Sequence, residues 1–179
     1  MKFVYFSLIT VSLAFFLHIL FVYYLPNVAM LIAFHHMKYN NKVGTNTFFH
    51  SGIPTPRLRN VPKPDPNLFY SLCTYDVSKY PVRFTAPIPD TSWSISFYAR
   101  NGSNFYATND QTFGSKEFNL ILTGKKNGDR FRKVTHKIIA PSDKGMAIIR
   151  SSIMNQKDPD KLVQLHKQVK CTPLNDQHV

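Results

Sequence analysis

The stretch at residues 93–108, WSISFYARNGSNFYAT, gives the clearest fold signal in the chain. Trp93, Ile95 and Phe97 alternate with more polar side chains, which is the period of two expected for a strand with one buried face. The pair Asn101-Gly102 follows, and such a pair accepts positive φ and suits a tight turn. Residues 105–108 then return as the antiparallel partner. The stretch therefore predicts a β-hairpin.

Similar short apolar runs continue on both sides of this hairpin. Between about residues 80 and 150 there are six or seven of them, separated by Asn-Gly, Pro and Ser-rich turns. That spacing favours an antiparallel sandwich or barrel. The period changes near Asp158-Pro159-Asp160, where a capping side chain, a proline and an acid mark a helix start. The prediction is a mainly antiparallel β domain, sandwich or barrel-like, with a C-terminal helix.

An N-terminal run, residues 3–25 (FVYFSLITVSLAFFLHILFVYYL), contains no Asp, Glu, Lys or Arg. A helix crosses a hydrocarbon core of about 30 Å in about 20 residues, so this run is long enough to span a membrane. Apolar residues continue beyond Pro26 to Phe34, as a helix on the membrane surface or a continuation of the anchor. We divide the chain into a transmembrane signal anchor at 1–26, a juxtamembrane and Pro-rich linker at 27–66, and the β-rich domain at 67–179.

The charges next to the anchor favour a cytoplasmic N-terminus. Lys2 lies at its start, whereas the other side has no lysine until Lys38 and Lys42. A cleaved signal peptide is the main rival, but its apolar core is shorter and ends at small residues. Here the run ends in Tyr23-Tyr24-Leu25-Pro26, which lacks the small residues. We therefore expect a retained anchor and an exported domain.

The formal net charge of +12 points to anionic partners such as lipid head groups or acidic proteins. The basic residues are scattered singly and in pairs, which is not the clustered pattern of nucleic-acid binding. We expect the membrane lipid bilayer to be a partner of this protein and nucleic acid not to be one.

The two cysteines, Cys73 and Cys171, are far apart in sequence and form no CxxC motif. In an exported domain, such a pair predicts one long-range disulfide between an early segment and the C-terminus. In a cytoplasmic domain the two thiols would be free.

Motifs for catalysis or metal binding are not found in the sequence. There is no GxSxG, HExxH or Gly-rich phosphate loop. The adjacent His35-His36 pair would point about 100° apart on a helix, which does not suit one shared metal ion. A set built on His136 or His166 can be written on paper, but only geometry defines a triad. We expect no metal, cofactor or catalytic residue, and an enzyme is the less favoured class.

Aromatic and polar side chains before and within the hairpin are the better candidates for binding. A sheet face that carries tyrosines beside an arginine can stack on sugars or hold a partner protein. For Trp93, Phe97 and Phe105, the alternation favours the core instead. The binding candidates are Tyr75, Asp76, Tyr98, Arg100, Asn104 and Tyr106.

Several segments, YSLCTYDVS at 70–78, Pro81, WSISFY at 93–98, NGSNF at 101–105, IAPS at 139–142 and AIIR at 147–150, resemble the bacterial family catalogued as domain of unknown function 1254. The likeness covers roughly residues 67–152. The resemblance implies an exported or membrane-bound protein of the bacterial inner membrane with a periplasmic domain. Longer members join this domain to a companion domain catalogued as unknown function 1214, which implies a separate companion protein for a short chain. The resemblance defines no catalytic residue.

These observations favour a membrane protein whose exported β domain acts as a binding or assembly module in the cell envelope. The alternative is an envelope hydrolase or carbohydrate-processing enzyme, which needs a concave pocket with convergent polar groups. A third hypothesis is a binder of lipids or anionic polymers that relies on the basic surface.

Overall fold

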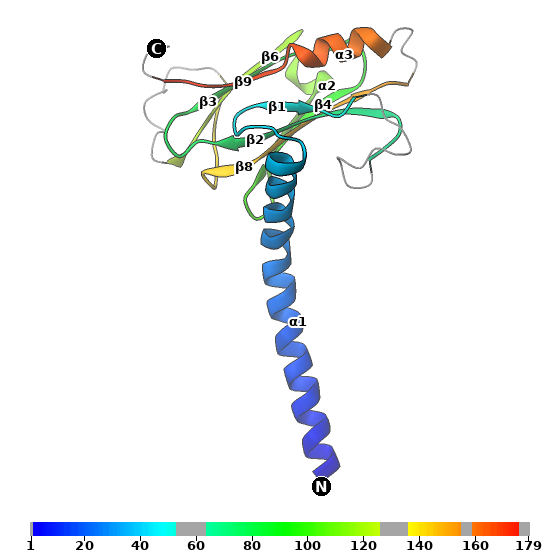
Figure 1. The fold of residues 1–179 in the computed structure, drawn as a ribbon, viewed down its shortest axis with the longest axis vertical. Helices are drawn as coiled ribbons and strands as arrows, with labels where there is room; N and C mark the ends of the chain where they lie inside the picture. The colour runs from blue at the N-terminus through cyan, green and yellow to red at the C-terminus, as the bar shows by residue number, and fades with distance from the viewer. Residues whose placement is uncertain (1, 53–63, 126–135, 155–158, 176–179) are drawn as a thin grey trace.

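The computed structural model describes residues 2–52, 64–125, 136–154 and 159–175 (Figure 1). In chain order the elements are α1 (Lys2–His35), the π-helical turn η1 (His36–Asn40), β1 (Phe48–His50), β2 (Leu68–Asp76), β3 (Val82–Pro87), β4 (Trp93–Ala99), β5 (Asn104–Asn109), α2 (Asp110–Phe113), β6 (Glu117–Thr123), β7 (Lys137–Ile139), β8 (Lys144–Ser152), α3 (Pro159–Lys167) and β9 (Lys170–Pro173).

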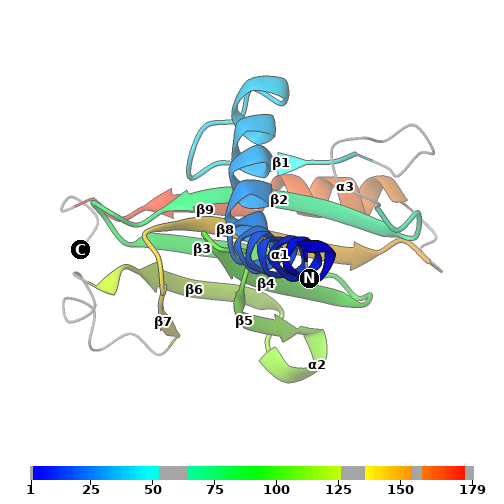
Figure 2. The same cartoon turned by 90° about the horizontal axis from the view of Figure 1, so that it is seen from below.

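The strands form two sheets that lie face to face. Sheet A has the order β1-β2-β8-β4-β5, and its neighbouring strands are antiparallel. Sheet B has the order β7-β6-β3-β9, where only the β6–β7 pair is parallel. Helix α1 projects from sheet A on the side away from sheet B, and α3 lies at the opposite side of the domain (Figures 1 and 2). The predicted fold class is confirmed: a long apolar helix, a sandwich-like β domain and a short helix near the C-terminus.

The predicted hairpin is present as β4 and β5. Ser96 pairs with Ala107, and Gly102 in the turn has a φ of 79°, a conformation that glycine adopts without strain. The register shifts after Phe97, so that Tyr98 pairs with Asn104. This bulge adds an extra residue to one strand, so the alternation of side chains between the two faces of the sheet is interrupted there.

The core between the sheets is largely aromatic. Phe84 of sheet B and Phe97 of sheet A meet edge to face, with ring centroids 5.0 Å apart, an arrangement that the ring quadrupoles favour. Trp93 and Phe97 are buried as predicted, and Phe105 packs against the same cluster while partly exposed. Burial of these rings removes apolar surface from water and helps to hold the two sheets together.

The outer face of sheet A is also covered, by the end of α1 and by η1. Met37 is buried in a second cluster with Tyr70, Leu72 and Met146, and Phe34 packs against it. Strand β2 is therefore buried on both faces over most of its length. This is why residues 68–76 read as an almost continuous apolar run rather than an alternating one.

The structure adds three details to the predicted segments of the chain. Helix α1 continues through Pro26 to His35, so the apolar segment after the proline extends the same apolar helix. Strand β1 lies inside the segment 27–66 that we predicted as a linker, and it pairs with β2; residues 53–63 of that segment are outside the described residues. After α3 the chain adds β9, which pairs with β3 and carries Cys171.

Candidate functional site

The six predicted binding residues separate between the core and the surface. Tyr75 is 1% exposed, and its hydroxyl donates to the carbonyl oxygen of Tyr98 at 3.0 Å across Gly145. Burial raises the pKa of Tyr75, so the hydroxyl stays protonated and keeps this bond. Tyr106 packs its ring 6.0 Å from Phe97, on the side of the core. Tyr75 and Tyr106 therefore pack against the core and do not form an exposed binding face.

Asp76 fixes the loop that follows η1. Its backbone N–H donates to the Asn46 side chain at 2.8 Å, and the Asn46 amide donates back to the Asp76 carbonyl at 3.2 Å. Its carboxylate accepts from the Ser78 backbone at 2.9 Å and pairs with Lys144 at 3.3 Å. Burial raises the pKa of Asp76, but the bonds from Ser78 and the nearby Lys144 outweigh it, so the pKa lies below its usual value.

Tyr98 lies on the outer face of sheet A beside Arg150. The Arg150 guanidinium donates to the Tyr98 hydroxyl and to Ser96 Oγ, both at 3.2 Å. Partial burial raises the pKa of Tyr98, but the hydrogen bond and charge of Arg150 lower it below the ordinary value. This part of the outer face is polar, and it continues the apolar part that α1 covers.

Arg100 and Asn104 are exposed at the β4–β5 turn. The turn approaches α1, because a Cβ built on Gly102 would lie 3.6 Å from the Met30 side chain. The structure therefore brings Tyr98, Arg100 and Asn104 together on the α1 side of the domain, while Tyr75 and Tyr106 face inward.

The two cysteines meet across the sandwich, as the sequence predicts, although they do not form a bond in this structure. Cys73 of β2 and Cys171 of β9 are both buried, with the two sulfur atoms 2.9 Å apart. A disulfide has a sulfur–sulfur bond of about 2.05 Å, so both residues are free thiols here. Burial and the contact with Cys73 raise the pKa of the Cys171 thiol well above its usual value.

Sequence reasoning missed a buried network of two serines and two histidines. Ser71 Oγ lies 2.6 Å from His166 Nδ1 and 2.8 Å from His50 Nδ1, and His166 Nε2 lies 2.8 Å from Ser151 Oγ. Both serines are 0% exposed and His166 is 3% exposed. Burial, with a smaller contribution from His50, lowers the pKa of His166 to about 3, so the ring is neutral. A neutral ring has one donor and one acceptor, which the two hydroxyl groups satisfy.

A hollow of about 310 Å³ lies where α1 and η1 meet sheet A. Leu31 and Phe34 form its apolar side, and Lys38, Arg100 and Lys144 border it with positive charge. Of these cations, only Arg100 was among the predicted binding residues. The other two come from η1 and from the start of β8, which no local sequence pattern connects. In the described ranges, no three His, Cys, Asp or Glu side chains cluster as metal ligands would.

Comparisons with solved structures support the fold. The VPA0106 protein from Vibrio parahaemolyticus is similar with a TM-score of 0.68 and 17% identity, over 88% of this chain and 37% of that one. An uncharacterized protein from Burkholderia cenocepacia is similar with a TM-score of 0.50 and 12% identity, over 85% of this chain and 40% of the other. The chain thus spans less than half the length of either structure. A comparison with curated proteins gave no match.

The family likeness that the motifs at 70–78 and 93–105 suggested extends further than the motifs themselves. It includes β1 at one end and β9 at the other, so it takes in both sheets of the sandwich. The chain belongs to the family described as protein of unknown function DUF1254, whose model matches residues 45–173.

Proposed function

We propose that this chain is a single-pass membrane protein whose exported β domain acts as a binding or assembly module in the bacterial cell envelope. The observation that supports it most is helix α1. Residues 3–25 are exposed throughout, including Phe3 at 91% and Phe21 at 62%, and the helix is long and apolar enough to cross a membrane. Water is a poor solvent for such a helix, whereas a bilayer satisfies it. Its other end packs on sheet A, so the anchor continues directly into the domain.

The flanking charges support an orientation with the N-terminus in the cytoplasm and the domain in the periplasm. C-terminal fusions to alkaline phosphatase and to a cytoplasmic reporter test it, because the phosphatase folds only after export. We expect phosphatase activity and membrane retention after alkaline extraction. An active cytoplasmic reporter would refute the orientation and with it the envelope setting.

The family resemblance supports a companion protein. Longer members of the family that the sequence resembles join this domain to a companion domain of unknown function 1214. Among the described strands at sheet edges, β5 has six residues, whereas β1 and β7 have three and β9 has four. A free edge of that length can accept a strand from a partner. We place the companion at β5, next to Arg100 and Asn104.

Photo-crosslinking in intact membranes tests this interface. A photoreactive amino acid replaces Ala107, which is exposed on β5, or Thr172, which is exposed on β9 as the matched control. We expect position 107 to crosslink a protein that mass spectrometry identifies as a member of the companion family, and position 172 not to. Crosslinking of that protein at 172 alone would contradict the docking at β5, and its absence at both positions would contradict the companion.

The alternative, an envelope hydrolase or carbohydrate-processing enzyme, receives little support from the buried network. A nucleophilic serine has to reach its substrate. The described hydrogen bonds between serine and histidine side chains converge on Ser71 and Ser151, which are both 0% exposed. His136, the other histidine considered, is exposed and lies with its ring 5.2 Å from Phe113.

A further inference from the structure

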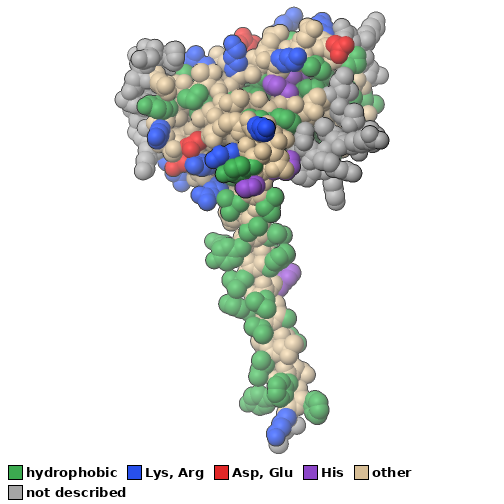
Figure 3. Space-filling view, in the orientation of Figure 1, with side chains coloured by type: hydrophobic (Ala, Val, Ile, Leu, Met, Phe, Trp, Pro, Cys, Tyr) green, Lys and Arg blue, Asp and Glu red, His purple; other side chains and the backbone are tan. Residues whose placement is uncertain are grey.

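The hollow between α1 and sheet A combines an apolar side with a cationic rim. Leu31 and Phe34 come from α1, Lys38 from η1, Arg100 from the β4–β5 turn and Lys144 from the start of β8. Three stretches that are distant in sequence, namely the α1–η1 junction, the β4–β5 turn and the start of β8, therefore build one concave site. Lys and Arg side chains gather on this side of the domain next to the end of α1 (Figure 3).

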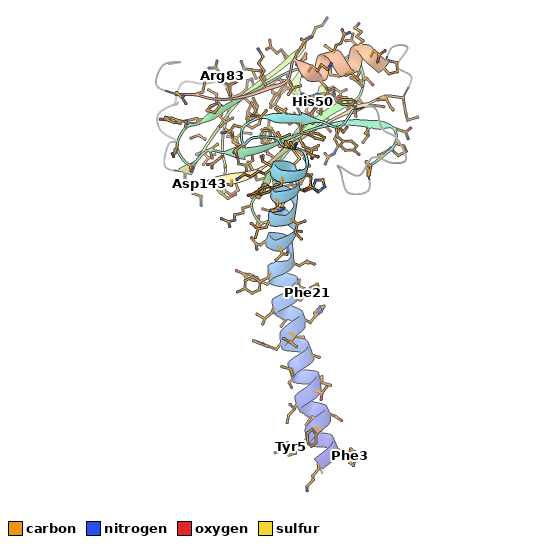
Figure 4. All side chains as sticks on the ribbon, viewed as in Figure 1. Phe3, Tyr5, Phe21, His50, Arg83 and Asp143 are labelled. Atoms are coloured by element: carbon orange, nitrogen blue, oxygen red, sulfur yellow. The ribbon has the colours of Figure 1, made fainter. Side chains whose placement is uncertain are left out.

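The rim keeps a net positive charge after its ion pair is counted. Lys144 pairs with Asp76 at 3.3 Å, and the lysine side chain is still 58% exposed. Lys38 and Arg100 are exposed, and the residues that line the hollow include no acid. Asp143 lies on the same side of the domain, next to Lys144 (Figure 4). A group with one or two negative charges would therefore be attracted to this rim.

The exposed apolar residues near the top of α1 show how close a bilayer would come. Leu31 is 50% exposed and Ile32 is 64% exposed, although both lie beyond the run that ends at Leu25. Lipid around α1 would cover these side chains and bring the hydrocarbon edge close to Ile32. Lys38 lies six residues further, about 9 Å along a helix, and the head-group layer of one leaflet is about 5–7 Å thick. The backbone at Lys38 then lies just above the head-group layer, and long Lys and Arg side chains reach from there to the lipid phosphates.

We propose that this hollow binds the head group of an anionic phospholipid in the leaflet below the domain. Lys38, Arg100 and Lys144 contact the phosphate, and the upper acyl chain lies along Leu31 and Phe34. The bound lipid would fix the height and tilt of the domain above the membrane. This inference rests on the proposed membrane anchoring, and it adds a lipid class and a site to it.

A second basic hollow provides a contrast. It is larger, about 670 Å³, and is bordered by Lys116, Lys167 and Lys170 beside sheet B. Sheet B lies on the side away from α1, where Arg83 is also found (Figure 4). A membrane that surrounds α1 cannot reach that side. Removing charge at one hollow and then at the other therefore distinguishes a specific lipid site from a general attraction of basic residues for anions.

Native mass spectrometry of the full chain in detergent micelles tests the proposal. Dioleoyl-phosphatidylglycerol and dioleoyl-phosphatidylcholine are titrated separately, and inorganic phosphate is titrated in a third series. We expect the anionic lipid to bind at least tenfold more tightly than the zwitterionic one. The variant Lys38→Gln/Arg100→Gln/Lys144→Gln should lose about fivefold in affinity for each charge removed, which abolishes that preference.

The matched control is Arg83→Gln/Lys116→Gln/Lys170→Gln, which removes the same charge from the sheet B side. We expect it to keep the wild-type preference, with circular dichroism showing that both variants fold. An equal loss in the control, or no preference in the wild type, would overturn the site. Phosphate binding as tight as lipid binding would assign the hollow to a free anion instead. Membrane retention after alkaline extraction is measured separately, so a failure of the lipid site is distinguishable from a failure of the anchor.

Discussion

At the scale of single residues, His166 shows how burial decides the chemistry of a side chain. Its ring lies between Ser71 and Ser151, with Phe69 at 4.4 Å between ring centroids. There is no carboxylate among these contacts to stabilise a charged imidazolium. The neutral ring and its two hydroxyl partners therefore act as a polar connection that holds α3 on the inner face of β2 and β8.

This burial predicts a loss of stability at acidic pH. The pKa of His166 is lowered from 6.5 to about 3, so the unfolded chain binds a proton that the folded chain does not. Stability is complete above pH 6.5 and falls as the pH decreases toward 3. We expect a loss of about 2 kcal/mol between pH 8 and pH 5 from this residue. Urea unfolding in micelles, followed by fluorescence of the single Trp93, measures it.

The variant His166→Gln should reduce this pH dependence, because the amide does not titrate. The pKa of His50 is also lowered, by burial and by Lys167, so a smaller slope of the same sign remains. The exposed His136→Gln is the matched control and should keep the wild-type slope. An unchanged slope in the His166 variant would show that another group causes the pH dependence.

Gly145 is a second residue whose role depends on its neighbours. A Cβ at this position would meet the Tyr75 hydroxyl and the Tyr98 carbonyl oxygen closer than real Cβ contacts occur. We expect Gly145→Ala to destabilise the protein by about 3 kcal/mol. Adding Tyr75→Phe should recover only part of the lost stability, because the clash with the Tyr98 carbonyl oxygen remains. The control Gly44→Ala, which has only a contact at 3.7 Å, should change the unfolding free energy little. Full recovery in the double variant would contradict the role of the Tyr98 backbone.

At the scale of elements, the junction of α1 with sheet A decides how the domain sits on the long apolar helix. Strand β2 is covered by α1 and η1 on one face and by the sandwich core on the other. Met37 is 3% exposed at the centre of the outer cluster. Between residues 27 and 52, the packing of a few large side chains and the pairing of β1 fix part of the segment that we predicted as a linker.

We expect Met37→Ala to weaken this junction by about 2–4 kcal/mol, because the cavity removes contacts with Tyr70, Leu72 and Met146. Limited trypsin digestion of the protein in micelles should then cut faster at Lys38 and Lys42. The control Tyr39→Ala removes a side chain that is 59% exposed and should leave the cutting rate unchanged. Equal rates in all three proteins would mean that the cluster does not hold the helix on the sheet.

At the scale of the whole molecule, the thiols of Cys73 and Cys171 face each other between the two sheets. We propose that the pair oxidises to a disulfide in the periplasm, which closes a loop of 98 residues (171 − 73) and adds about 2–4 kcal/mol of stability. Burial protects even free thiols from reagents, so the chain must be denatured before alkylation. We then expect no labelled cysteine without reductant and two with it. Two labels without reductant would refute the bond.

The sequence by itself determined the long apolar helix, the β4–β5 hairpin and the start of α3. Each depends on a local pattern: an uncharged run of 23 residues, a period of two with a Gly at positive φ, and Pro at the first helical position. Each pattern reflects the backbone preferences and the burial of a single segment. Residues that are close together in the sequence are enough to determine both.

Only the tertiary structure decided that β1 belongs to the sheet, that Tyr75 is buried, and that His166 meets two serines. It also decided that Lys38, Arg100 and Lys144 form one rim. These arrangements depend on contacts between segments far apart in the chain, and no residue pattern within one segment specifies them. The bulge after Phe97 adds to this, since it changes which side chains of β5 face the core. The apolar helix is therefore visible in the sequence, whereas the hollow beside it exists only once the sheets have assembled.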